Sequence, residues 1–159
     1  MKNTILTVLG ITALVACSPV KANEFTGTHV ALTAGLDDLR SVPDTTDVTY
    51  GVTAGADFSL GENAIVGGAV NVDNVFDRRD LGASIRLGYI LTDNLLAYGR
   101  VGYSNYQDVF SRELDGLQLG GGLEFNINDY TFTRVEYKYT DFESGVGKHQ
   151  GLVGLGVRF

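Results

Sequence analysis

The 159-residue sequence has few of the residues from which a disulfide, a reactive thiol or a metal site is built. Cys17 is the single cysteine, so no disulfide framework can form within the chain. His29 and His149 are the only histidines, and neither has a second histidine at a metal-binding spacing. We therefore expect no metal site, no cofactor and no catalytic residues.

Basic residues are scarce as well. The chain has 12 Lys and Arg against 19 Asp and Glu, for a formal net charge of −7. Loss of the N-terminal Lys2 and Lys21 would make the remaining chain still more negative. This balance argues against a nucleic-acid partner, because such partners require a positive surface.

Long apolar runs are missing except at the N-terminus. Ile5–Ala16 follows Lys2 and is too short to cross a bilayer as a helix. Val20–Ala22 offers small residues to a signal peptidase, so we predict a signal peptide over residues 1–22 and one domain over residues 23–159. Alternatively, Leu14–Cys17 resembles a bacterial lipobox, which would place a lipid on Cys17. Both interpretations predict export, and no later segment is apolar enough for a transmembrane helix.

The later chain alternates in character. In Thr133–Thr140 every second residue is charged, and the residues between them are apolar or aromatic: Arg134, Glu136 and Lys138 against Val135, Tyr137 and Tyr139. A helix would spread these residues around its circumference, whereas a strand separates them onto two faces. β-branched and aromatic residues also favour a strand.

The same alternation recurs in eight segments. They cover residues 29–36, 48–60, 66–73, 81–89, 97–104, 117–127, 133–140 and 150–159. The second, fourth and sixth end in short turns, at Gly61–Asn63, Thr92–Asn94 and Asn128–Asp129. The other connections are longer and charged: Asp37–Asp47, Asn74–Asp80, Gln107–Glu113 and Glu143–Lys148. This asymmetry is typical of transmembrane β-barrels.

One face of these segments is apolar throughout, while the other is rich in glycine and carries ionisable residues. The predicted lumen charge network comprises Asp57, Arg86, Arg100, Glu124, Arg134, Glu136, Lys138 and Arg158. A soluble barrel would not hold these charges inside and its leucines outside. The apolar face must therefore meet lipid, where only a closed sheet satisfies the backbone. We predict an all-β fold, an eight-stranded antiparallel up-and-down transmembrane β-barrel.

The inward charges must pair in so narrow a space. Two interpretations remain open, a static network that fills the barrel and a gate that re-pairs to pass small ions. In either case we expect Arg134 to pair with Glu136 or Glu124. The glycines of the same face would leave room for arginines that reach across the lumen.

Four segments resemble known outer-membrane barrels: Phe25–Gly27, Leu96–Tyr103, Thr133–Asp141 and Gly145–Phe159. Together they are similar to the small barrels of the OmpA transmembrane type, and more closely to the opacity-like porin-family barrels of Gram-negative bacteria. The resemblance implies an outer-membrane location with both termini in the periplasm. It also implies that the last strand is read by the barrel-assembly machinery, through Val153, Leu155, Val157 and Phe159. The connections are shorter than those of the adhesive opacity proteins.

The leading functional hypothesis is a structural outer-membrane barrel that contributes to envelope integrity and has no wide pore. The alternatives are a narrow ion-conducting channel, a surface adhesion or interaction protein and, in a different class, a soluble ligand-binding barrel. An enzyme is not expected, since neither histidine lies in the His-x-Ser pair of lipid A deacylases.

We expect a monomer in contact with outer-membrane lipid and lipopolysaccharide. Divalent cations could bridge lipopolysaccharide to the loop carboxylates, predicted as Asp37, Asp38, Asp44, Asp47, Asp108, Glu113, Asp115, Asp141 and Glu143. Interfacial aromatic girdles are predicted to include Tyr89, Tyr103, Tyr137 and Tyr139.

Overall fold

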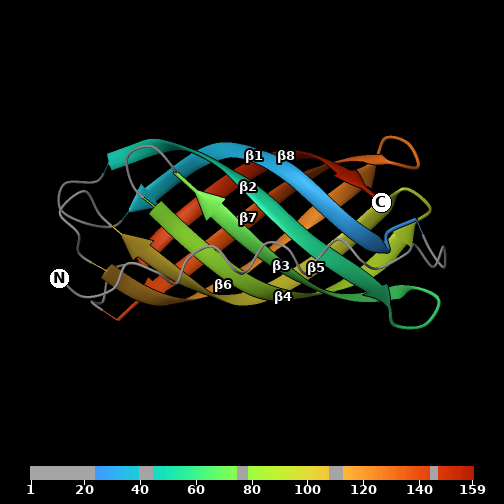
Figure 1. Ribbon diagram of the computed structural model, residues 1–159, viewed down its shortest axis with the longest axis horizontal. Helices are drawn as coiled ribbons and strands as arrows, with labels where there is room; N and C mark the ends of the chain where they lie inside the picture. The colour runs from blue at the N-terminus through green and yellow to red at the C-terminus, as the bar shows by residue number, and fades with distance from the viewer. Residues whose placement is uncertain (1–23, 40–44, 75–78, 108–112, 144–146) are drawn as a thin grey trace, which may run out of the picture.

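The computed structural model describes residues 24–39, 45–74, 79–107, 113–143 and 147–159. They form a closed barrel in which strands neighbour one another in chain order (Figure 1). The strands are β1 (Gly27–Leu39), β2 (Thr45–Ser59), β3 (Ala64–Asp73), β4 (Arg79–Thr92), β5 (Leu95–Gln107), β6 (Glu113–Asn126), β7 (Thr131–Phe142) and β8 (Gly147–Arg158). The predicted fold class is confirmed. The predicted signal peptide and Cys17 lie outside the described residues.

The barrel is closed by antiparallel pairing of the first and last strands, as between Val30 and Val157. Every other pair is antiparallel too, so the chain runs up and down around the ring. Within the described part of the chain, no helix is long and apolar enough to cross a membrane.

Several strands extend into the segments that were predicted from the sequence to be long loops. The predicted Asp37–Asp47 loop is wrong at both ends, because β1 continues to Leu39 and β2 starts at Thr45. Asp80 and Lys148 likewise belong to β4 and β8 instead of loops. The physical reason is that the backbone ladder continues wherever inward polar residues find partners, and local sequence patterns do not reveal those partners.

Several predicted loop carboxylates are therefore strand residues. Asp38 and Asp47 lie in β1 and β2, and Glu113, Asp115 and Asp141 lie in β6 and β7. Asp37 is buried inside the barrel. Glu143 follows β7 and is exposed, and Asp44 and Asp108 lie outside the described residues.

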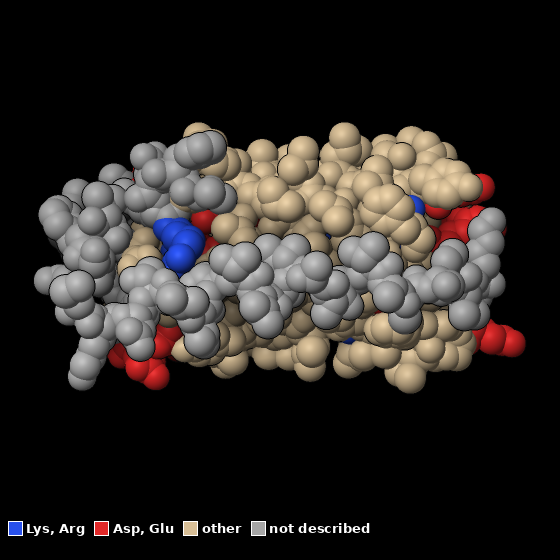
Figure 2. All heavy atoms as spheres, in the orientation of Figure 1, with Lys and Arg blue, Asp and Glu red and all other residues tan. Residues whose placement is uncertain are grey.

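The two faces of the wall separate by side-chain type as predicted. Outward residues are large and apolar, for example Leu32 at 66% and Val135 at 62% exposure, while their neighbours Ala31 and Arg134 are buried. In Figure 2 the charged atoms gather mostly toward the two ends, with uncharged residues between them. The predicted girdle residues Tyr89, Tyr103 and Tyr137 are exposed on this outer wall.

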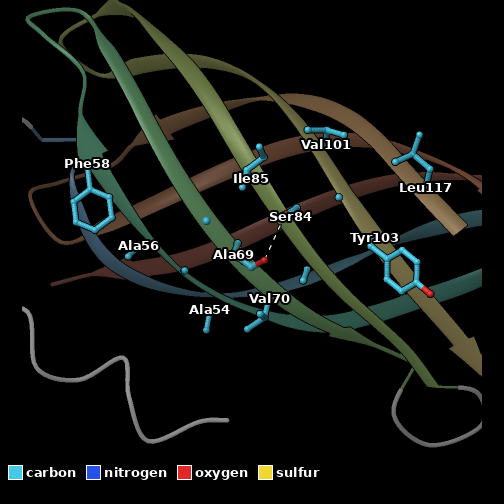
Figure 3. A pocket seen from close by; sticks show the side chains of 14 residues that line it. Ala54, Ala56, Phe58, Ala69, Val70, Ser84, Ile85, Val101, Tyr103 and Leu117 are labelled. Atoms are coloured by element: carbon cyan, nitrogen blue, oxygen red, sulfur yellow. Dashed lines mark hydrogen bonds between the residues drawn. The ribbon is translucent and has the colours of Figure 1, made fainter. Parts of the chain in front are cut away.

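The outer wall has a shallow apolar groove over β2–β5. Ala54, Ala56, Gly68 and Ala83 line it, and larger side chains such as Phe58 stand beside them (Figure 3). The groove arises because small residues of adjacent strands come together there. It opens outward, so it is not an entrance to the lumen.

The two ends of the barrel differ. The short-turn end holds the connections at 60–63, 93–94 and 127–130 together with Phe159. The opposite end, here called the long-loop end, is where β1 ends at Leu39 and β2 begins at Thr45. Glu24 and Phe25 precede β1, so they also lie at the short-turn end.

Candidate functional site

The candidate site is the interior of the barrel, where alternate residues of every strand converge. All eight residues of the predicted lumen charge network lie on inward positions, and none is more than 8% exposed. Charges so deeply buried must be compensated by partners at hydrogen-bond distance.

A chain of ion pairs crosses the interior. Arg86 donates two hydrogen bonds to Asp57, from Nε to Oδ1 at 2.7 Å and from Nη2 to Oδ2 at 2.5 Å. Its Nη1 donates to Glu124 Oε2 at 3.1 Å, and Arg158 Nη2 donates to the other oxygen of Glu124. This chain links β2, β4, β6 and β8. A bidentate arginine–carboxylate pair is among the strongest interactions that a protein interior offers.

Gly67 makes the first of these pairs possible. It stands between Asp57 and Arg86 in the register of β2, β3 and β4. A Cβ on Gly67 would lie 3.0 Å from Asp57 Cγ, so the carboxylate occupies the space that a side chain would need. The arginine thus reaches over a glycine to a carboxylate on the strand beyond.

A second group surrounds Glu136. Arg100 Nη1 donates to its Oε1 at 2.7 Å, and Tyr98 Oη donates to its Oε2 at 2.5 Å. Arg100 also donates through Nη2 to Ser84 Oγ at 2.7 Å. Both carboxylate oxygens of Glu136 are therefore satisfied.

A third group lies toward the long-loop end. Lys138 donates to Asp73 at 2.9 Å, and Lys148 donates to Asp80 at 3.0 Å and lies 3.3 Å from Asp37. Of these five residues only Lys138 was in the predicted network. Asp73 lies at the end of a predicted strand, and the predicted strands stopped short of Asp37, Asp80 and Lys148. Continued alternation would have found the others: Asp80 precedes the outward Leu81, and Lys148 lies two residues before the inward Gln150.

Arg134 corrects the sequence interpretation. The expected direct contact with Glu136 or Glu124 is wrong: within the described residues Arg134 has no carboxylate within 4.0 Å, and its Nε has no hydrogen-bond partner. Its charge interacts with Glu136 only at longer range. Both glutamates are bound by other residues instead. The side chain of Arg134 lies over Gly154, where an added Cβ would be 3.1 Å from Arg134 Cγ, and its Cζ is 5.9 Å from the Phe132 ring centroid.

An apolar plug lies at the short-turn end. Phe25, Ile65 and Leu96 are 0% exposed and pack together with Tyr98. The carbonyl of Glu24 accepts hydrogen bonds from Arg158 Nη1 at 2.9 Å and Asn126 Nδ2 at 3.3 Å. The plug was not predicted from the sequence, although Ile65 and Leu96 are apolar residues on inward positions beside short turns.

Gly27 sets the course of the segment that carries Phe25. Its φ of +118° lies in a region that residues other than glycine rarely adopt. The backbone there approaches the carbonyl of Phe159 too closely for a Cβ. The chain can therefore fold inward just before β1 begins.

The remaining predicted residues lie elsewhere. Val153, Leu155, Val157 and Phe159 form an outward apolar row at the end of the chain and take no part in the lumen. His29 is buried, with Nδ1 3.0 Å from Asp57 Oδ2. The described residues contain no group of three or more His, Cys, Asp or Glu side chains placed to hold a metal ion.

Comparison with protein families adds an independent observation. The outer membrane protein beta-barrel domain matches residues 7–159, which is nearly the whole sequence. The chain belongs to this family. No curated protein sequence matches it.

Solved structures share the architecture at low sequence identity. Ail, the attachment invasion locus protein of Yersinia pestis, was solved with the heparin analogue sucrose octasulfate; it is 13% identical, with 84% of this chain and 99% of that chain covered and a TM-score of 0.60. Neisserial surface protein A is 13% identical over 84% of this chain and 98% of that chain, with a TM-score of 0.62. The N-terminal barrel of Pseudomonas aeruginosa OprF is 16% identical over 82% and 97%, with a TM-score of 0.52. At such identities the likeness establishes the fold alone.

Proposed function

We propose that this protein is a structural barrel of the outer membrane that contributes to envelope integrity and has no wide pore. The observation that carries the proposal is the filled interior. Ion pairs run across it from Asp57 through Arg86 and Glu124 to Arg158, and Phe25 is packed into the short-turn end.

Opening such an interior by re-pairing its charges would be costly. Breaking a buried pair leaves an uncompensated charge, at a cost of about 3–5 kcal/mol. Arg86 and Glu124 each take part in two ion pairs, so moving either one disturbs its partners as well. The arrangement therefore favours a static filling over a gate.

The proposal includes a route to the membrane. The signal peptide over residues 1–22 would be removed on export, unless Cys17 is lipidated. The barrel-assembly machinery would then read the outward row of Val153, Leu155, Val157 and Phe159, which are 42–66% exposed. In the membrane the barrel would be a monomer in a Gram-negative outer membrane, surrounded by lipid and lipopolysaccharide.

Planar-bilayer recording tests the absence of a pore. Purified wild-type protein should give no discrete conductance steps, and Phe25→Ala should give small steps or raised leak, since it removes the largest fully buried side chain of the plug. Phe58→Ala is the matched control, because Phe58 is 57% exposed on the outer wall and should leave the bilayer silent. Steady single-channel steps from the wild type would contradict the proposal.

A narrow ion channel is the second candidate, supported by one feature. Gln118, Gln150, Thr33 and Thr49 are buried on inward positions, and each has a polar side-chain atom without a hydrogen-bond partner. Buried polar atoms of this kind are normally satisfied by ordered water. Such water would hydrate part of the lumen, and the same recordings distinguish this candidate from a closed barrel.

A surface-interaction role is the third candidate. Ail was solved with a polysulfated sugar analogue. The present chain has a net charge of −7, which opposes binding of a polyanion. A partner of this kind is therefore not favoured here.

A further inference from the structure

Arg134 is a buried cation with no protein counter-charge in contact. It is 4% exposed and makes no ion pair within the described residues, and its Nε, like those of Arg100 and Arg158, lacks an acceptor. The other interior arginines all have carboxylate partners: Arg86 binds Asp57 and Glu124, Arg100 binds Glu136, and Arg158 binds Glu124. Those three arginines and three carboxylates balance one another, which leaves the positive charge of Arg134 in excess.

The lysines do not change this balance. Lys138 is neutralised by Asp73. Lys148 faces both Asp37 and Asp80, so that group has a negative excess at the long-loop end. His29 contacts Asp57, which Arg86 already binds. Among the described interior arginines and lysines, Arg134 is thus the one without a carboxylate in contact.

The register around Arg134 repeats the arrangement around Arg86, with one difference. Arg86 reaches over Gly67 to Asp57 on the strand beyond. Arg134 pairs with Gly154, and Gly154 pairs with Thr33 on the strand beyond. The row Arg86–Gly67–Asp57 ends in a carboxylate, whereas the row Arg134–Gly154–Thr33 ends in a hydroxyl.

The side-chain hydroxyl of Thr33 also lacks a partner among the described residues. Thr33 is 8% exposed, and its Oγ1 makes no hydrogen bond. Arg134 Nε lies 3.2 Å from the point where a Cβ on Gly154 would be, so the guanidinium group covers the glycine that separates it from Thr33. Strands are spaced by about 4.8 Å, which sets the two Cα atoms roughly 10 Å apart across the missing side chain.

We propose that Arg134 and Thr33 bind a single halide-sized anion, chloride in the cell, above Gly154. Guanidinium has hydrogen-bond donors and no acceptor, and a threonine hydroxyl can donate as well. The site thus suits an anion that replaces the missing carboxylate. A water molecule would satisfy the donors but would supply no counter-charge in contact with the guanidinium group. The filled interior restricts the ligand to a small ion.

Unfolding in matched salts tests the site. The full chain in detergent micelles would be titrated with urea in sodium chloride and in sodium gluconate at equal ionic strength, so that general screening is the same. Chloride should raise the unfolding midpoint of the wild type in a saturable manner, because it binds the folded state. Arg134→Gln and Thr33→Val should lose this dependence.

Two controls separate a specific site from a general salt effect. Thr49→Val removes another buried, unpartnered hydroxyl that does not flank Gly154, and it should keep the chloride response. Thr33→Asp introduces a carboxylate at the position that corresponds to Asp57 in the row Arg86–Gly67–Asp57. In gluconate its midpoint should rise to that of the wild type in chloride, with no further response to chloride.

Several results would overturn the proposal. One is a chloride response that persists in Arg134→Gln; another is a wild type that responds equally to both salts. A large loss of stability in Arg134→Gln in gluconate would mean that a protein group already compensates Arg134. Crystals grown in bromide should show anomalous density at hydrogen-bond distance from Arg134. Such density without the solution effect would indicate an adventitious ion only, and would also count against the site.

Discussion

At the scale of single residues, the contribution of each interior charge depends on the number of oppositely charged groups that it contacts. Glu124 joins two arginines: one oxygen binds Arg86, the other binds Arg158, and the residue is 0% exposed. Its removal affects two arginines at once, whereas the loss of an end member such as Asp57 affects Arg86 and His29.

Glu124→Gln should therefore destabilise the barrel. The change removes the negative charge that compensates two buried guanidinium groups, and breaking a buried pair costs about 3–5 kcal/mol. Urea unfolding in detergent micelles, followed by tyrosine fluorescence, measures the effect. Asp129→Asn, in the exposed turn between β6 and β7, is the control and should stay within about 0.5 kcal/mol of the wild type. Equal midpoints for the two variants would contradict the network.

Inward glycines should tolerate a methyl group poorly. A Cβ on Gly122 would lie 2.9 Å from Tyr98 Oη, whereas one on Gly151, on the outer face of β8, would meet nothing within 4 Å. We expect Gly122→Ala to lower stability by about 1–3 kcal/mol through overpacking. Gly151→Ala should be neutral or should stabilise by up to about 1 kcal/mol, since alanine restricts the unfolded chain. Urea titrations in which Gly151→Ala is less stable than Gly122→Ala would contradict this prediction, because they would show that the lumen can accommodate the added methyl group.

At the scale of elements, the strands have two sets of partners. Their outer rows meet lipid, and their inner rows meet the charge network, so one strand carries both an apolar stripe and a polar stripe. In β7 this gives Val135 and Tyr137 outside and Arg134, Glu136 and Lys138 inside. Inward partners also lengthen the strands, as Asp37 and Lys148 do for β1 and β8.

A charge on the outer row should be penalised according to depth. Val153, near the middle of β8, is 57% exposed, and Leu60, beside the turn after β2, is 58% exposed. Val153→Arg should cost about 2–4 kcal/mol in a bilayer, and Leu60→Arg about 0–1 kcal/mol, because the penalty falls toward the interface. Refolding into lipid vesicles with urea titration measures both without the cellular assembly machinery. Equal costs would argue that this wall does not face hydrocarbon.

At the scale of the whole molecule, closure of the ring gives the barrel its cooperativity. Pairing of β1 with β8 leaves no free strand edge among the described strands. The wall and the interior therefore stabilise each other, since the ion pairs join strands that are not neighbours in the sheet, such as β2 with β4 and β6 with β8.

Heat modifiability should follow from this closure. A closed, fully hydrogen-bonded barrel resists cold detergent, so outer-membrane fractions run on an SDS gel should give a band that shifts on boiling. The shifted band should be in the outer-membrane fraction. Recovery of the protein in the periplasm, without a heat-dependent shift, would contradict the membrane assignment and support a soluble barrel.

The sequence alone determined the number of strands and the faces to which the side chains of each predicted segment point, but not where the strands begin and end. These properties follow from an alternation with a period of two residues, which is local and can be read from each segment by itself. Thr133–Thr140 is the clearest case, because its charges and its aromatics separate without reference to any other strand. The eight lumen residues were found in the same way.

Only the tertiary structure decided which lumen charges meet. Arg86 binds Asp57 and Glu124, and Arg134 binds neither of the glutamates predicted for it, because inward contacts depend on the register and stagger of strands around the closed ring. The plug at Phe25 depends in the same way on how the segment before Gly27 folds inward. A local pattern tells which residues point into the lumen, and the closed barrel decides how far apart they lie.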